Sequence, residues 1–206
     1  MSTADTLLRL GAATLGETGG RPMHPRIKGA WTGASVAGPA YTATCAPGDN
    51  LAIHAAVVAA PAGTVLVVSA DSPPELGYWG EVLTTAAESR GLLGLVIDGG
   101  VRDVAALEAH RFPVFSALVA LRGAVKVAGG EIGGVARVGD VDVAAGDWVV
   151  ADRDGVTVIP AATLAVVMET GQARADKESA MFTALLAGAT TVDLLGLDTT
   201  PVRRRD

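Results

Sequence analysis

The strongest constraint on the fold is a regular alternation of two hydrophobic patterns between residues 36 and 120. Four short runs rich in Val, Leu and Ala, each bounded by Gly, Pro or Asp, are predicted to be strands: 36–46, 63–70, 91–99 and 112–120. Between them lie three segments with helical spacing that stop at Pro or Gly: 52–61, 78–91 and 103–111. Because several of these strands are apolar on both faces, the order predicts an α/β fold in which helices cover a sheet.

The pattern changes after residue 120, where short alternating strands are separated by turn dipeptides. Gly-Asp or Asp-Gly pairs at 139–140, 146–147 and 154–155 are typical of tight turns between such strands. No linker or internal repeat divides the chain, and 206 residues are enough to bury one core. We therefore expect a single domain spanning residues 1–206.

A charged helix is predicted near the C-terminal end, from Ala161 to about Leu186, within a helical extension of about 161–197. Pro160 is a start signal, and Gly171 marks a position where the helix could kink or divide. The charged residues of this helix would either pack on another subunit or form a solvated face.

Composition argues against several classes of function. The formal net charge is -6, and the only basic run, 203–205, is interpreted as a frayed terminus, so we expect no nucleic-acid partner. There is no signal segment and no apolar span of about 18 residues, so we expect a soluble, cytoplasmic protein that makes no use of a membrane. The single cysteine, Cys45, cannot form an intramolecular disulfide and is interpreted as a small buried hydrophobe.

An arginine and an aspartate stand side by side, Arg102 and Asp103, just past the apolar run 91–99. Neighbouring side chains diverge on a strand and in a helix, so we expect the two not to form a simple surface ion pair. At the carboxyl end of a strand in an open α/β sheet, the guanidinium could hold a carboxylate and the aspartate a hard cation. The alternative is structural, with Asp103 as the N-cap of the next helix and Arg102 packed over the sheet edge.

A second candidate site lies where the helix within 78–91 begins. If that helix starts near Gly80, the backbone N–H groups of Val82 and Leu83 are first-turn donors, which favour an anion. Glu81 would lie in the same turn, where the alternative role of its carboxylate is a favourable interaction with the helix dipole.

Other reactive residues carry weaker signals. His54 lies on an apolar helical stretch and is interpreted as a satisfied core or interface histidine rather than a ligand. No His/Cys cluster indicates zinc, and no Gly-rich phosphate loop is present. The three lysines, Lys126 among them, leave a Schiff-base mechanism formally open, but none is in an evidently desolvating context.

Three segments together resemble a known family: PGDNLAIHAAVVAAPAGTVLVV, WGEVLTTAAESRGLLGLVIDGGVRDVAALEAHRFPVFS, and VAAGDWVVADRDGVTVIP followed by a charged helix. From about Met23 to Leu197 the chain is similar to the regulator-of-ribonuclease-activity-A-like (RraA-like) family, which includes divalent-metal-dependent 4-hydroxy-4-methyl-2-oxoglutarate (HMG) aldolases. The resemblance implies a swivelling β/β/α fold with a C-terminal helical extension. It also implies a homotrimer or homohexamer with active sites between subunits.

For the metal, the resemblance to the aldolase branch implies that Asp103 binds Mg²⁺ or Mn²⁺. Glu81 matches the acidic residue at the start of the preceding helix and would contact the metal through water. Glu178, from the C-terminal helix of a neighbouring subunit, would complete the water shell around the metal.

For the substrate, the resemblance implies that Arg102 binds the pyruvyl part and that the amides of Val82 and Leu83 receive pyruvate beside Glu81. The implied activity is that of a lyase, a class II pyruvate aldolase that cleaves 4-hydroxy-2-oxo diacids of the HMG type to pyruvate and a second 2-oxo acid. Oxaloacetate decarboxylation passes through the same enolate and is expected as well.

The family also implies an alternative, a non-catalytic protein of the same fold that regulates a ribonuclease or helicase by binding it. In that branch the metal-binding aspartate is typically replaced, so Asp103 favours the enzyme. Two departures from the aldolase pattern stand against the enzyme, and the second of them indicates either a different distal part of the substrate or no aldol substrate at all. Ala106 stands where many aldolases carry an acidic residue, and SALVALRGAVKV lacks the usual polar, Pro-containing form.

Overall fold

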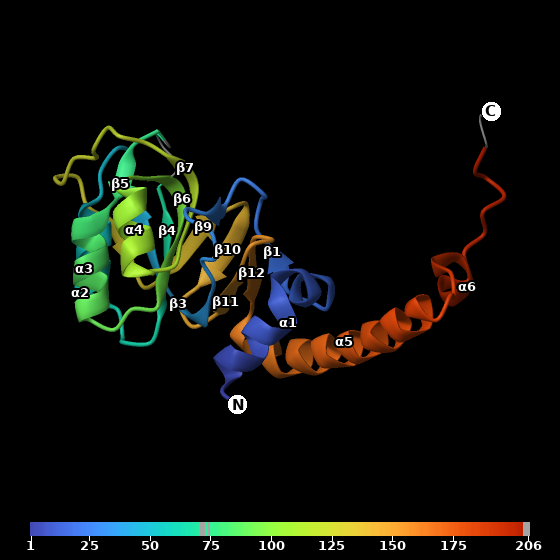
Figure 1. Cartoon of the computed structure of the whole chain (residues 1–206). Coiled ribbons are helices and arrows are strands. Elements are labelled where there is room, and N and C mark those ends of the chain that lie inside the picture. The colour runs from blue at the N-terminus through green and yellow to red at the C-terminus, as the bar shows by residue number, and fades with distance from the viewer. Residues whose placement is uncertain (71–72, 74, 204–206) are drawn as a thin grey trace.

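Four parallel strands form the centre of the structure (Figure 1). The computed structural model describes residues 1–70, 73 and 75–203. The central strands lie in the order β3 (Val36–Cys45), β4 (Val65–Ser69), β6 (Gly94–Val101) and β7 (Val114–Val119). These are the four strands that the apolar runs predict. Every residue of β6 is buried, which accounts for the predominantly apolar composition of the strand, with Asp98 as its one charged residue.

Three helices cover one face of these strands: α2 (Leu51–Ala59), α3 (Glu81–Ser89) and α4 (Val104–His110). All three were predicted, but the helix expected at 78–91 begins later. Residues Gly77–Trp79 form a short strand, β5, parallel to β6, which buries Tyr78 and Trp79. The Trp79 ring stacks on Phe112 with 6.1 Å between ring centroids. Aromatic packing therefore favours a buried strand at Gly77–Trp79 over the first turn of the predicted helix.

The remaining strands extend and curl the sheet. On one side β3 pairs with β11 (Trp148–Ala151), which continues to β12 (Val156–Ile159) and β1 (Arg21–Pro22), all antiparallel. On the other side β7 pairs with β2 (Lys28–Gly29). The short strand β8 (Gly130–Ile132) pairs with the carboxyl end of β3, beyond the part of β3 that pairs with β11. A separate hairpin of β9 (Val135–Val138) and β10 (Val141–Ala144) packs on the face that α2, α3 and α4 leave open and encloses a second apolar core. The result is a curled half-barrel.

The turn between β9 and β10 confirms the turn prediction at 139–140. Gly139 and Asp140 both have positive φ, 54° and 65°, and they join the paired residues Val138 and Val141. A two-residue turn with both central residues left-handed matches the twist of a hairpin, and glycine and aspartate tolerate that conformation.

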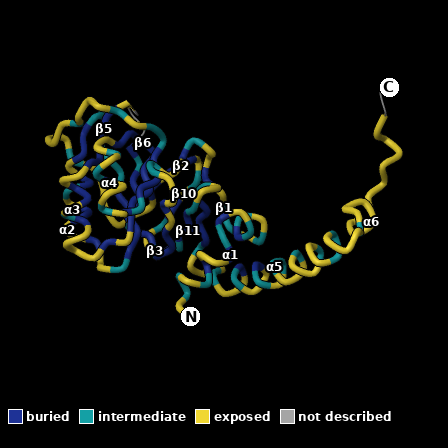
Figure 2. Tube along the Cα trace, viewed as in Figure 1, coloured by how far each residue is buried: buried dark blue, intermediate teal, exposed yellow. Residues whose placement is uncertain are grey.

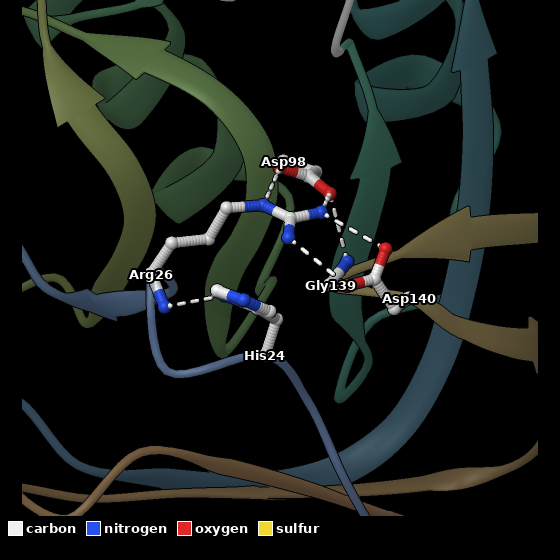
Figure 3. A network of polar contacts seen from close by, with 5 residues as sticks. All are labelled: His24, Arg26, Asp98, Gly139 and Asp140. Atoms are coloured by element: carbon white, nitrogen blue, oxygen red, sulfur yellow. Dashed lines mark hydrogen bonds and ion pairs between the residues drawn. The ribbon is translucent and has the colours of Figure 1, made fainter.

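An ion cluster ties this turn to the central sheet (Figure 3). Asp98, near the end of β6, is 5% exposed and accepts hydrogen bonds from Arg26 Nε at 3.0 Å and Nη2 at 2.7 Å. It also accepts one from the backbone N–H of Gly139 at 2.8 Å. Arg26 reaches Asp140 as well, with Nη1 3.1 Å from Oδ2. Three distant segments of the chain are therefore joined at one buried carboxylate.

An N-terminal helix, α1 (Thr3–Glu17), was not predicted. Ser2 and Asp5 form a capping box at its start, with Ser2 Oγ accepting from the Asp5 N–H at 3.1 Å. Leu7, Leu10 and Leu15 are buried against β11 and the start of the C-terminal helix. The capping box is the sequence signal that identifies the start of the helix, and Gly11, with φ 82°, kinks it between Leu10 and Leu15.

The predicted C-terminal helix is present as α5 (Leu164–Leu186), preceded by one 3₁₀ turn, η1 (Ala161–Thr163), and followed by α6 (Thr191–Leu195). Gly171 neither kinks nor divides it. The residue is buried against Leu10 of α1, and the absence of a side chain on Gly171 allows the two helices to approach closely. Beyond this contact α5 projects away from the body, and most of its outer surface is exposed (Figures 1 and 2). Among the described residues, no helix combines the length and hydrophobicity needed to span a membrane.

Candidate functional site

A cavity of about 410 Å³ opens where β5 and β6 reach their carboxyl ends. Its wall comes from α2, from the β5–α3 and β6–α4 connections, and from the segment that follows β7. The lining residues are Asn50, His54, Gly77, Tyr78, Trp79, Gly80, Val82, Leu83, Arg102, Asp103, Gly123, Ala124 and Lys126. Arg102, Asp103, Val82 and Leu83, four of the residues singled out in the sequence, therefore meet at one cavity. This is the location at which open α/β sheets bind ligands.

Asp103 has an unusual backbone conformation that sets the geometry of the site. Its φ is 56°, in the left-handed region, which aspartate tolerates better than most residues. It holds the N-cap position of α4, but its side chain makes no hydrogen bond to that helix. Instead Oδ2 accepts a hydrogen bond from the backbone N–H of Glu81 at 3.1 Å, so the carboxylate lies at the start of α3. The expected N-cap role is thus replaced by a contact between two helices.

The expectation that Arg102 and Asp103 do not pair was wrong. Arg102 Nε lies 3.7 Å from Asp103 Oδ2. The left-handed turn at Asp103 is neither strand nor helix, so the divergence expected of adjacent side chains in regular structure does not apply. Both side chains are nearly half exposed, at 45% and 44%, so this pair contributes little to stability and both groups are open to a ligand.

Gly80 provides the space that this arrangement requires. A Cβ at this position would clash with Oδ2 of Asp103 and would lie 3.1 Å from Cγ of Arg102. The glycine therefore allows the carboxylate to approach the first turn of α3. Sequence reasoning placed Gly80 at the helix start but did not identify this steric requirement.

Val82 and Leu83 lie in the first turn of α3 and line the cavity, as predicted. The N–H groups of a first helical turn have no intrahelical acceptor, and the helix dipole adds partial positive charge there. Together with the Arg102 guanidinium, this end of the cavity favours a carboxylate or another anion.

Glu81 begins the same helix, but it is not among the residues that line the cavity. One of its carboxylate oxygens lies 3.6 Å from Nε2 of His110, whose Nδ1 lies 2.8 Å from Oε2 of Glu88. The contact with Glu88 is the main reason why the pKa of His110 is raised. In a single chain the Glu81 carboxylate is therefore directed toward α4 rather than into the cavity.

Glu178 lies on α5, where one of its oxygens is 2.9 Å from Nε of Arg174 one turn earlier. It is not among the cavity-lining residues of the single chain. A role for Glu178 in the site requires a second copy of the chain and stays a prediction.

Sequence reasoning missed three polar residues of the cavity: Asn50, His54 and Lys126. His54 was interpreted as a satisfied core histidine, but its Nε2 is buried with no hydrogen-bond partner among the described residues. Burial, with Lys126 as a second cause, lowers the pKa of His54, so the neutral imidazole is favoured. The spacing N-x-x-x-H at the start of a helix, which places both side chains on one face, is the signal that was available.

The donor set suits a hard divalent cation that keeps most of its water. Among the described residues, Asp103 is the one carboxylate on the cavity wall, and these residues contain no cluster of three or more His, Cys, Asp or Glu able to hold a metal ion. Zinc sites in proteins usually need three or four such ligands. Mg²⁺, in contrast, is commonly held by one or two carboxylates together with water and substrate oxygens.

Fold and site together define an α/β protein whose ligand cavity joins an Arg-Asp pair to a helix N-terminus. The chain belongs to the RraA-like family, described as Aldolase/RraA, which matches residues 4–158. This confirms the family and the fold that the sequence segments indicate.

Relatives of known sequence point the same way. Over 125 residues the chain is 38% identical to a protein of Halalkalibacterium halodurans named "Putative 4-hydroxy-4-methyl-2-oxoglutarate aldolase". That match covers 61% of this chain and 60% of the relative, less than two thirds of its length. A protein of the same name from Burkholderia multivorans is 33% identical over 150 residues, 73% of this chain and 88% of the relative.

Solved structures share the fold. A protein of unknown function from Pseudomonas syringae pv. tomato aligns with a TM-score of 0.76 and 23% identity, covering 93% of this chain and 97% of that one. RraAS2 of Streptomyces coelicolor, described as an unusual member of the RNase ES inhibitor RraA protein family, aligns with a TM-score of 0.74 and 25% identity. The alignment covers 88% of this chain and 95% of RraAS2.

Proposed function

We propose that this protein is a divalent-metal-dependent lyase that cleaves 4-hydroxy-2-oxo diacids of the HMG type to pyruvate and a second 2-oxo acid. The observation that carries the proposal is the meeting of Arg102, Asp103 and the first turn of α3 at one cavity. Oxaloacetate decarboxylation is part of the proposal, because it generates the same pyruvate enolate. The relatives named as aldolases support it at 33% and 38% identity.

The anion-binding end of the cavity would hold the 2-oxo acid. Arg102 is able to grip a carboxylate with two parallel hydrogen bonds, and the first-turn amides of Val82 and Leu83 offer further donors. These groups fix the substrate in one orientation, and the fixed positive charge of Arg102 favours the negative charge that builds up as the carbon–carbon bond breaks.

Mg²⁺ or Mn²⁺ would be held by Asp103, whose second carboxylate oxygen makes no hydrogen bond within the described residues. When bound, the cation would polarise the 2-oxo group and carry part of the developing negative charge. Glu81 and, from a neighbouring copy, Glu178 would support its water shell. For Glu81 this requires the carboxylate to turn from His110 toward the cavity.

Assembly is part of the proposal. The outer half of α5 has no partner within the described chain apart from its own neighbours, and it carries exposed Phe182 and Leu186. A homotrimer or homohexamer would bring this helix against a second copy and Glu178 near its cavity. The partners are therefore a small 2-oxo acid and further copies of the chain.

A second candidate function is non-catalytic regulation of a ribonuclease or helicase by direct binding. The similarity to RraAS2, described as a member of an RNase inhibitor family, favours it. Asp103 separates the two candidates, because a protein that acts only by binding has no need of a carboxylate at this cavity.

Pyruvate release measured with coupled lactate dehydrogenase tests the proposal. HMG and oxaloacetate are each supplied with Mg²⁺, with Mn²⁺ and with EDTA. We expect metal-dependent release from both substrates and a loss of at least about 100-fold in Asp103→Asn and Arg102→Ala. Asparagine suits the left-handed backbone at position 103, so this variant removes the charge and keeps the fold. Full activity of Asp103→Asn in EDTA would refute the proposal, and silence of the wild type on both substrates would favour the regulatory candidate.

A further inference from the structure

Two residues that line the cavity each have a buried polar atom with no hydrogen-bond partner among the described residues: Oδ1 of Asn50 and Nε2 of His54. Asn50 is 5% exposed, and both residues come from the start of α2. Buried polar groups in native proteins are nearly always paired, so unpaired ones on a cavity wall indicate a ligand that supplies the missing partner.

The hydrogen bonds of Asn50 determine what that partner is. Its amide nitrogen donates to the backbone oxygen of Tyr78 at 2.8 Å, which fixes the orientation of the side chain. The remaining atom, Oδ1, is only an acceptor. The missing group must therefore be a donor, such as a hydroxyl or a protonated nitrogen.

His54 stands one helical turn after Asn50 on the same face of α2. Burial and the positive charge of Lys126 lower its pKa, and Asp49 acts in the opposite direction. The neutral imidazole that results has one acceptor nitrogen. With the hydrogen at Nδ1, the buried Nε2 is free to accept a proton.

Both residues line the same cavity as Arg102 and Asp103. The proposed substrate carries one alcohol, at C4, two carbons from the 2-oxo group that Arg102 and the α3 amides would hold. Cleavage of the C3–C4 bond requires a base to take the proton of that alcohol. Arg102 and the α3 amides are donors, and the proposed function assigns the Asp103 carboxylate to the cation, so another described residue of the cavity must act as the base.

We propose that His54 is the base that removes the proton of the C4 hydroxyl, an assignment that rests on the proposed function. Nε2 takes the proton, the oxygen electrons form the new C4 carbonyl, the C3–C4 bond breaks, and its electron pair becomes the enolate of pyruvate. Oδ1 of Asn50, an acceptor without a partner among the described residues and one helical turn before His54, would accept a hydrogen bond from the protonated imidazole after a small adjustment of the side chains. After the second 2-oxo acid leaves, His54 returns its proton to water and C3 of the enolate takes one from water, so the reaction balances without a further reagent.

Oxaloacetate gives a matched control, because its decarboxylation breaks the C3–C4 bond without any hydroxyl to deprotonate. The test is therefore His54→Gln, assayed on HMG and on oxaloacetate at saturating Mg²⁺. Glutamine keeps a polar side chain at this position but cannot act as a base near neutral pH. His24→Gln, which changes a histidine outside the cavity, is the control for loss of imidazole in general.

We expect His54→Gln to lose about 10²- to 10⁴-fold in kcat on HMG, the usual contribution of a general base, and less than about threefold on oxaloacetate. His24→Gln should retain both activities. Retained HMG cleavage in His54→Gln, or an equal loss on both substrates, would overturn the assignment while leaving the proposed function intact. A wild type that releases pyruvate from neither substrate would reject the proposed function and the base together.

Asn50→Leu provides a second readout that does not rely on loss of the imidazole. It removes the acceptor for the protonated His54, so the kcat on HMG should fall while the oxaloacetate rate persists. An Asn50→Leu variant with unchanged kcat on HMG would show that the unpaired oxygen has no part in the reaction. Circular dichroism of each variant establishes that it is folded.

Discussion

Replacing Asp98 with alanine should destabilise the protein strongly, although the residue lies outside the cavity. The substitution deletes the hydrogen bonds from Nε and Nη2 of Arg26 and from the Gly139 N–H. It leaves the buried N–H of Gly139 without a partner and Arg26 with only the exposed Asp140.

The magnitude follows from burial. Breaking a fully buried ion pair costs about 3–5 kcal/mol, and a hydrogen bond to a charged group contributes about 1.5–3 kcal/mol. Arg26 is 35% exposed and keeps its contact with Asp140, so the lower end applies, about 3 kcal/mol in the free energy of unfolding. In a chain of this size about 1 kcal/mol corresponds to about 2–4 °C, so the Tm should fall by about 6–12 °C.

Asp140→Asn is the matched control, because it removes the charge of the other carboxylate on the same arginine and asparagine tolerates the left-handed backbone at this position. Asp140 is 58% exposed, so this ion pair should contribute no more than about 1 kcal/mol. Thermal melting followed by circular dichroism, at one fixed protein concentration, compares the two variants. Equal losses in the two, or a loss below about 1 kcal/mol in Asp98→Ala, would refute the idea that the buried carboxylate holds the three segments together.

Three other outcomes are expected. Gly80→Ala should abolish pyruvate release with little change in Tm, because the new Cβ would displace the Asp103 carboxylate; Gly134→Ala, with no atom within 4 Å of its Cβ, should leave both unchanged. The Cys45 thiol, whose pKa burial raises to about 12, should react with a disulfide reagent near pH 8 only after unfolding in urea, and rapid reaction of the native protein would contradict its burial. His110→Gln should lower the Tm below about pH 6.5, because the protonated ring is stabilised by its glutamate partner on α3. The effect should become smaller as the pH rises through the raised pKa of His110 in the folded state. An equal loss of Tm at all pH values would exclude this linkage.

The sequence predicted the central strands well, because β3, β4, β6 and β7 are continuous apolar runs with clear boundaries. It also placed Arg102 and Asp103 correctly just after a strand, because the apolar run that forms β6 ends directly before them. The left-handed backbone of Asp103, and with it the pairing to Arg102, arises from a contact with α3 that no local pattern records.

The polar residues at the start of α2 also have properties that local sequence patterns do not reveal. The N-x-x-x-H spacing indicates that Asn50 and His54 share a face, but only the folded structure reveals that Nε2 of His54 has no partner among the described residues. The direction of the Glu81 side chain is also a tertiary property, because it depends on His110 at the far end of α4. Element positions were thus predictable from local patterns, whereas side-chain roles depended on which elements meet.

The hydrogen bond from the Glu81 N–H to Asp103 gives one carboxylate two roles. The same group that would bind a cation also satisfies an otherwise unpaired donor at the start of α3. If a cation binds Asp103 as proposed, its binding and the local order of α3 would be thermodynamically linked, so each would bias the other by the same free energy. The order of the first turn of α3, which supplies the anion-binding amides, would therefore depend on whether a cation is bound at Asp103, even before the substrate binds.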